Sequence, residues 1–250
     1  MNITVTRNSM SQGPIGTSFS KGQRSYTDTV LLSKSSDIEQ AVFEFEKKRE
    51  QRRIKDLQDA VSRVRSIPEQ MPMDAQMFEM MEELHLPKGN LPTNLSRFNV
   101  LLKKHCIGGI GYHNENGGIV FYSNTIGGYA YIGESGFCLF SSRENRKDDT
   151  VLVFENILDY IAYRVLMSMQ GKFVDGDCLV VNEFCNFVPA MLQCENYKHI
   201  LCFFHSDSES SLAMCDTFLD RLKYVTKDMS HIYSDKGFSC MLDLVASLHK

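Results

Sequence analysis

The sequence has little that points to a secreted or membrane protein. No apolar run approaches the ~20 residues that a membrane-spanning helix needs. The first residues, MNITVTRNSMSQGPIG, lack the apolar segment of a signal peptide. The eight cysteines form no C-x-x-C pair and mostly have apolar neighbours, which is typical of reduced core thiols rather than of a disulfide framework or a zinc site. These absences predict a cytoplasmic protein.

Familiar catalytic and nucleotide-binding motifs are also absent. No G-x-G-x-x-G follows an expected strand, and Gly171-Lys172 lacks the upstream glycine of a phosphate-binding loop. No G-x-S-x-G sequence supports a serine hydrolase. The formal charge of -4 gives no global attraction to nucleic acid or to an anionic membrane. Any nucleic-acid contact therefore requires a local basic patch.

The remaining composition is that of a globular chain with room for a sizeable core. Its 250 residues are 43% hydrophobic, which suits one large domain or one domain with a smaller appendage. We expect a flexible tail (1–30), a long charged helix (31–70), a small helical and β-meander subdomain (71–149) and an α/β domain (150–250). The polar stretch 141–150 marks the expected boundary of the last domain.

The long helix begins at a capping box formed by Ser36 and Glu39 and extends to Ser66, ahead of Pro68. Basic residues are concentrated in its middle, at Lys47, Lys48, Arg49, Arg52, Arg53 and Lys55. Two interpretations remain open. The helix is either a solvated or self-associating coiled coil over 36–66, which would bind a protein partner or a second copy, or a nucleic-acid contact.

The middle of the chain predicts short elements. A Met-rich helix lies between Met71 and Pro92, and a further helix is expected over 95–104. The runs IVFYS, YAYIG and FCLFS then alternate with glycine-rich turns, which predicts an antiparallel meander. The run Gly108-Gly109-Ile110-Gly111 opens no helix and does not predict a phosphate loop.

The last hundred residues alternate apolar strands with amphipathic helices. The expected strands are VLVF (151–154), CLVVN (178–182), HILCFF (199–204) and SHIYS (230–234). A helical pattern follows each strand. Continuous apolar strands that alternate with helices are typical of a parallel sheet covered on both faces. We therefore predict an α/β fold with a doubly wound, mostly parallel four-stranded sheet.

Acidic residues follow two of these strands. Glu155 ends the first, and Asp207 lies just after the third, within the sequence HSDSE. Ligands of open parallel sheets bind at the carboxyl ends of the strands. If the two strands are neighbours, Glu155 and Asp207 face one crevice, and paired carboxylates there suit Mg²⁺. The alternative is that both acids only cap the helices that follow.

The two stretches resemble motifs of the TOPRIM domain, most closely the primase type found in phage and mobile-element proteins. VLVFENILDYIAY is similar to the first motif, a strand followed by Glu-Gly and then Asp, with Glu155 and Asp159 in place. YKHILCFFHSDSESSLAM is similar to the strand that leads into Asp-x-Asp, with Asp207 as the second Asp. The glycine-rich meander GGIVFYSNTIGGYAYIG also resembles the segment before TOPRIM, so the resemblance covers roughly residues 95–250.

The resemblance implies a TOPRIM-like fold and metal-dependent phosphoryl or nucleotidyl transfer on DNA or RNA. Glu155 would be the general acid or base. Asp207 would hold Mg²⁺ or Mn²⁺, together with Asp159 and with Glu209 as a substitute carboxylate. His205 stands where the family has its first Asp, and imidazole suits Mn²⁺, Zn²⁺ or Fe²⁺ better than Mg²⁺.

Other departures leave the function open. Asn156 replaces the family's glycine, and the cysteines lack the spacing of a primase-type zinc ribbon. The first hypothesis is a TOPRIM-like, nucleic-acid-associated protein with a degenerate metal site and reduced or no catalysis. The second is an active primase-like or nuclease-like enzyme that depends on a divalent metal. The third is an α/β assembly or interaction protein whose acids are helix caps.

Overall fold

The computed structural model describes residues 2–4, 29–31, 35–64, 68–102, 105–141, 149–174 and 176–249. They belong to two compact units, Met1–Lys55 and Asp56–Lys250. In the first unit, β1 (Asn2–Thr4) and β2 (Thr29–Leu31) pair as antiparallel strands. Three of the segments discussed above lie outside the described residues. They are most of the expected tail, the middle of the linker at 141–150 and the side chains of the capping box.

The long helix is confirmed as α1 (Ser35–Ser62), which begins in the first unit and ends in the second. It ends four residues earlier than the sequence predicts, at Ser62. In the second unit its last turns belong to a hydrophobic core. Val61 is fully buried there, and Leu57 and Val64 pack against the same cluster.

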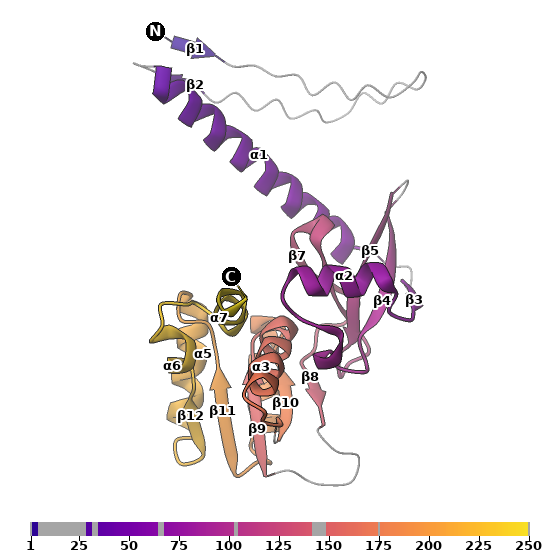
Figure 1. The fold of residues 1–250 in the computed structure, drawn as a ribbon, viewed down its shortest axis with the longest axis vertical. Coiled ribbons are helices and arrows are strands. Elements are labelled where there is room, and N and C mark those ends of the chain that lie inside the picture. The colour runs from indigo at the N-terminus through magenta and orange to yellow at the C-terminus, as the bar shows by residue number, and fades with distance from the viewer. Residues whose placement is uncertain are drawn as a thin grey trace. The chain divides into compact units, whose positions relative to one another are not determined.

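The second unit contains an antiparallel meander, as the glycine-rich turns predict (Figure 1). Its strands, each bonded to the next, are β3 (Glu69–Met71), β4 (Ser96–Leu102), β5 (His105–His113), β6 (Ile119–Ser123) and β7 (Gly128–Ile132). The Met-rich helix is α2 (Ala75–Glu83), with Met77, Met80 and Met81 buried. Short 3-10 turns, η1 (Lys88–Asn90) and η2 (Asn124–Ile126), connect these elements.

The helix predicted over 95–104 is wrong, because this segment forms β4. Phe98 and Val100 are buried, whereas the next residue, Leu101, is 66% exposed. Burial that alternates with a two-residue period is typical of a strand. The neighbouring glycines of β5 make room for aromatic rings. A Cβ at Gly109 would lie 2.6 Å from Cζ of Phe121, so this glycine serves packing rather than phosphate binding.

The other sheet of the second unit is mostly parallel and has five strands. In spatial order they are β12 (Thr226–Asp228), β11 (His199–Phe203), β9 (Thr150–Phe154), β10 (Asp177–Val180) and β8 (Cys138–Phe140). The first four are parallel to one another, and β8 is antiparallel to β10. The last run of the expected meander, FCLFS, therefore belongs to this sheet rather than to the antiparallel one.

Helices cover both faces of the mostly parallel sheet, as predicted. They are α3 (Ile157–Met169), α4 (Phe187–Cys194), which the 3-10 turn η3 (Phe184–Asn186) precedes, α5 (Glu209–Arg221), α6 (His231–Ser234) and α7 (Met241–Leu248). Leu152 and Phe154 share a core with α3 and α7, whereas Val151 and Val153 share another with α4 and α5. This alternation along β9 follows from the pleat of a strand that is buried on both faces.

The fourth strand predicted at 230–234 is wrong. These residues include α6, and the fourth parallel strand is β12, a few residues earlier. The Asp228 side chain accepts a hydrogen bond from the backbone N–H of Ser230 at 2.8 Å, which turns the chain away from the sheet. Short apolar runs such as HIYS do not distinguish a strand from one helical turn by periodicity. Among the described residues, no helix combines the length and apolar character needed to cross a membrane.

Candidate functional site

The candidate site lies where the carboxyl ends of β9 and β11 meet. The two strands are parallel neighbours, with Phe154 paired to Phe203. Beyond β9 the chain enters α3 on one face of the sheet, and beyond β11 it enters α5 on the other face. Such a divergence opens a crevice at the strand ends, which is where ligands of doubly wound folds bind. The sequence correctly placed its two acidic stretches at one edge.

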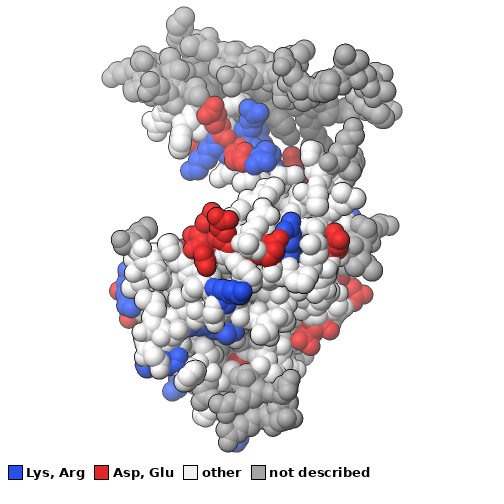
Figure 2. Space-filling view, turned by 45° about the vertical axis from the view of Figure 1, so that its right-hand side comes forward, with Lys and Arg blue, Asp and Glu red and all other residues white. Residues whose placement is uncertain are grey.

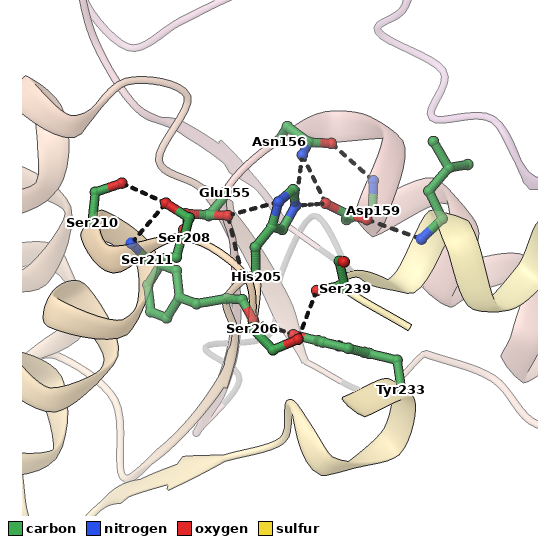
Figure 3. Close-up of polar contacts among 12 residues, drawn as sticks. Glu155, Asn156, Asp159, His205, Ser206, Ser208, Ser210, Ser211, Tyr233 and Ser239 are labelled. Atoms are coloured by element: carbon green, nitrogen blue, oxygen red, sulfur yellow. Dashed lines mark hydrogen bonds and ion pairs between the residues drawn. The ribbon is translucent and has the colours of Figure 1, made fainter. Parts of the chain in front are cut away.

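Glu155 lies at this edge of the sheet and is held from two sides (Figure 3). Its Oε2 accepts a hydrogen bond from the backbone N–H of His205 at 3.2 Å and lies 3.4 Å from Nδ1 of the same residue. Its Oε1 accepts a hydrogen bond from the hydroxyl of buried Ser211 in α5. The carboxylate is therefore fixed by groups from the loop after β11 and from the helix that follows it.

Asp159 is the most deeply buried carboxylate of the site, at 2% exposed. Its Oδ1 accepts the backbone N–H of Leu242 in α7 at 3.0 Å. Its Oδ2 accepts a hydrogen bond from Nδ2 of Asn156 at 2.7 Å and one from Nε2 of His205 at 2.6 Å. Burial of a charge is tolerated only when it is paired and hydrogen-bonded, and Asp159 meets both conditions.

His205 lies between the two carboxylates, with Nδ1 toward Glu155 and Nε2 toward Asp159 (Figure 3). Burial by itself lowers the pKa of this imidazole. The hydrogen bond and charge of Asp159, with the charges of Glu155 and Asp207, outweigh burial and raise the pKa to about 9. At neutral pH the ring is therefore an imidazolium that neutralises part of the acidic site.

The other two predicted metal ligands stand apart from this hydrogen-bond network. Asp207 and Glu209 are exposed, and Glu209 lies in the first turn of α5. His205 rather than Asp207 makes the contact with Glu155. The helix-capping alternative for Glu155 and Asp207 is wrong, because Asn156 caps α3 and Ser208 caps α5.

The donor set fits Mg²⁺ poorly. Mg²⁺ requires near-octahedral oxygen ligands and retains several waters. Here an imidazole contacts both the half-buried Glu155 and the buried Asp159, and Oδ2 of Asp159 already accepts two hydrogen bonds from side chains. The expected Mg²⁺ or Mn²⁺ stays a prediction, as do the metal-binding roles of Asp159, His205, Asp207 and Glu209.

Cys240 also lies at the site and was missed by sequence reasoning, as were Ser211 and Tyr129. The ligand atoms of Asp159, His205 and Cys240 all lie within 4.8 Å of one another. Burial and then the charge of Asp159 raise the pKa of the Cys240 thiol. No sequence motif includes this cysteine, because Asp159 and His205 both lie at least 35 residues before it in the chain. Only the approach of α7 to α3 and β11 brings them together.

Tyrosines of the antiparallel sheet contact the same edge. The hydroxyl of Tyr129 donates to Oδ1 of Asn156 at 3.1 Å. At the end of β10, the hydroxyl of Tyr131 donates to the carbonyl of Asn182 at 2.7 Å, and the hydroxyl of Tyr112 donates to its side chain at 2.5 Å. The antiparallel sheet therefore orients the loops after β9 and β10.

The six basic residues of α1 are all exposed. Exposed acids of the same helix lie next to them in the sequence, and Arg53 pairs with Glu50. Figure 2 likewise shows blue and red side chains interspersed in small groups on the face drawn. The six residues lie in the first compact unit and the acidic site in the second. Their role in nucleic-acid binding stays a prediction.

Comparisons with known proteins give a distant structural likeness. No protein-family model matches the chain, and no curated protein matches it. Among solved structures, it is similar to the primase fragment of the bacteriophage T7 primase-helicase protein, at 10% sequence identity and a TM-score of 0.44. The match covers 73% of this chain and 72% of that one. A likeness this distant does not assign the chain to a family.

Proposed function

We propose that the chain is a TOPRIM-like, nucleic-acid-associated protein whose acidic site has lost most or all Mg²⁺-dependent catalysis. The observation that carries the proposal is the position of His205. Its ring lies 3.4 Å from Oε2 of Glu155 and 2.6 Å from Oδ2 of Asp159, where the resembling family uses an aspartate. An internal imidazolium supplies the positive charge that a metal ion would otherwise bring to these carboxylates.

The chemistry of phosphoryl transfer supports the loss of catalysis. The transferred group carries negative charge, which metal ions held by several oxygens must neutralise. His205 replaces one of those oxygens, and its imidazole hydrogen-bonds to Asp159 and pairs with Glu155. Glu155 has a second partner in Ser211, so it is not free to act as a general base without rearrangement.

Two features favour nucleic-acid binding: the basic side chains of α1 and the resemblance to TOPRIM motifs. The six basic side chains of α1 are exposed and can reach phosphates without unfolding the helix. Binding to phosphates releases counterions, so the affinity should fall steeply as salt concentration rises.

The test is fluorescence anisotropy of the full chain with labelled single- and double-stranded DNA and RNA over a range of salt concentrations. We expect salt-sensitive binding that weakens when Lys47, Lys48, Arg49, Arg52, Arg53 and Lys55 are changed to Gln, with the salt slope falling by about 1 for each phosphate contact removed. The matched control changes Glu44, Glu46 and Glu50 of the same helix to Gln, and it should not weaken binding.

The same preparations decide between the proposal and an active enzyme. We expect no primer synthesis or nuclease activity with Mg²⁺. A Mg²⁺-dependent reaction that Glu155→Gln abolishes, while the unfolding transition stays in place, would establish the active enzyme instead. Absence of salt-sensitive binding to every nucleic acid would favour the assembly protein.

A further inference from the structure

Three side chains with different metal-binding atoms converge beside Glu155. Asp159 comes from α3, His205 from the loop two residues after β11 and Cys240 from the residue before α7. Their ligand atoms lie within 4.8 Å of one another, and Asp159 and Cys240 are 2% and 9% exposed. An oxygen, a nitrogen and a sulfur ligand are therefore brought to one point by three separate elements.

The ligand atoms are oriented by contacts on their far sides. Nδ1 of His205 faces Oε2 of Glu155 at 3.4 Å, which leaves Nε2 directed toward Asp159. Oδ1 of Asp159 accepts the backbone N–H of Leu242, which leaves Oδ2 directed toward His205. A carboxylate behind a ligating histidine fixes its tautomer and ring orientation in known metal sites. Glu155 is placed to do this for His205.

We propose that Asp159, His205 and Cys240 form a site for one divalent transition-metal ion of the zinc class. Nε2 of His205, the Cys240 thiolate and a carboxylate oxygen of Asp159 would be the three protein ligands, and a water would complete a tetrahedral set. Glu155 is a positioning residue that holds His205. The inference rests on the same histidine as the proposed function, but it does not require nucleic-acid binding.

The chemistry of this ligand set separates zinc from magnesium. Thiolate and imidazole favour Zn²⁺, Co²⁺ or Cu⁺ over the hard oxygen-seeking Mg²⁺. When the ion binds, Nε2 of His205 and the thiol of Cys240 each lose their proton to solvent, and the bonds to the metal replace the hydrogen bond between His205 and Asp159. The ion would join α3, β11 and the start of α7, so binding should also stabilise the fold.

The experiment is a titration of the full chain, stripped with chelator, by Co²⁺ as an optical probe. We expect saturation at one equivalent, with the visible bands of four-coordinate Co²⁺ and a near-ultraviolet sulfur-to-cobalt charge-transfer band, both removed by added Zn²⁺. Cys240→Ser should abolish the charge-transfer band. Cys215→Ser is the matched control, because Cys215 is comparably buried at 7% exposed and should leave the band intact.

Two further measurements keep the proposal falsifiable if Cys240→Ser does not fold. Glu155→Gln should retain the charge-transfer band and weaken Co²⁺ binding about 10- to 100-fold, as expected for a residue behind a ligand. X-ray absorption of the wild-type zinc complex should show one sulfur among the ligands.

The proposal is overturned if the wild type shows no saturable Co²⁺ binding, if the band persists in Cys240→Ser, or if the zinc complex has no sulfur ligand. None of these results bears on the salt-sensitive binding measured on metal-free protein. Conversely, a failure of nucleic-acid binding would leave the cobalt spectrum unaffected.

Discussion

Nε2 of His205 lies 2.6 Å from Oδ2 of Asp159, and this contact joins the end of β11 to the first turn of α3. The two residues come from neighbouring strand–helix units whose helices leave on opposite faces of the sheet. The crevice between such units is where a ligand normally binds. Here a side chain of the protein spans it, so the site is also a structural link.

Loss of the buried carboxylate should cost more stability than loss of the exposed one. Asp159→Ala removes the acceptor for Leu242, Asn156 and His205 and leaves the imidazolium with one partner fewer. Breaking a buried ion pair from one side costs roughly 3–5 kcal/mol. Asp207→Ala should cost less than about 1 kcal/mol, because Asp207 is exposed. Urea denaturation of the metal-free protein measures the unfolding free energy that each substitution removes. Equal losses for the two variants would contradict the structural role of Asp159.

An aspartate at position 205, as in the TOPRIM motif that the sequence resembles, should create a response to Mg²⁺. His205→Asp places a third carboxylate beside Glu155 and Asp159, so the metal-free variant should be less stable than the wild type through like-charge repulsion. Mg²⁺ neutralises such a cluster, and millimolar Mg²⁺ should raise the melting temperature of the variant but not of the wild type.

The control for this comparison is His231→Asp, at an exposed histidine of α6. It places a new carboxylate at a residue outside the acidic site and should gain no response to Mg²⁺. A wild type that is stabilised by Mg²⁺ as strongly as His205→Asp would show that the acidic site already accepts the ion, contrary to the proposed function.

The stability of metal-free protein should fall as pH rises through the pKa of His205. The folded-state pKa is raised to about 9 from an ordinary value of 6.5, so folding favours the protonated ring. Its contribution is fully present below pH 6.5 and is lost as pH rises through about 9. This contribution of His205 to the free energy of unfolding is at most about 3 kcal/mol. Unfolding free energies at several pH values, with chelator present, should decline more steeply for wild type than for His205→Gln. Parallel curves would contradict the raised pKa.

The sequence predicts where the site lies in the fold better than which side chains contact one another there. Glu155 ends an apolar strand and His205 follows another, and the carboxyl ends of parallel strands share one edge of a sheet. That argument needs only the alternation of strands and helices, which residues 150–250 display clearly. Such a sheet allows only a few strand orders, and some of them place these two strands side by side. In the structure β9 and β11 are indeed neighbours.

The partners of each side chain depend on long-range packing and could not be read from the chain. Asp207 lies two residues after His205, yet it is exposed while His205 turns inward between Glu155 and Asp159. Cys240 reaches the site only because α7 packs against α3. The strand β4 was missed for a related reason. Its neighbour β5 supplies hydrogen-bond partners along its whole length, and this pairing outweighs the weak helical pattern of the segment.

Asn156 should matter more than an ordinary helix cap. Its side chain accepts the backbone N–H of Asp159 at 3.1 Å, donates to Oδ2 of Asp159 and accepts a hydrogen bond from Tyr129. Asn156→Gly, which restores the glycine of the resembling motif, removes all three contacts.

Ser208 caps α5 by accepting the backbone N–H of Ser211, and it gives a matched comparison. Replacing a cap by glycine costs only a few tenths of a kcal/mol, so Ser208→Gly should change the free energy of unfolding little. Asn156→Gly should lose about 1–3 kcal/mol, because the buried oxygen of Asp159 also loses a hydrogen bond to a charged group. Denaturation of both variants at neutral pH distinguishes the two cases. If the losses are equal, Asn156 acts only as a cap, and the site does not depend on it for the orientation of Asp159.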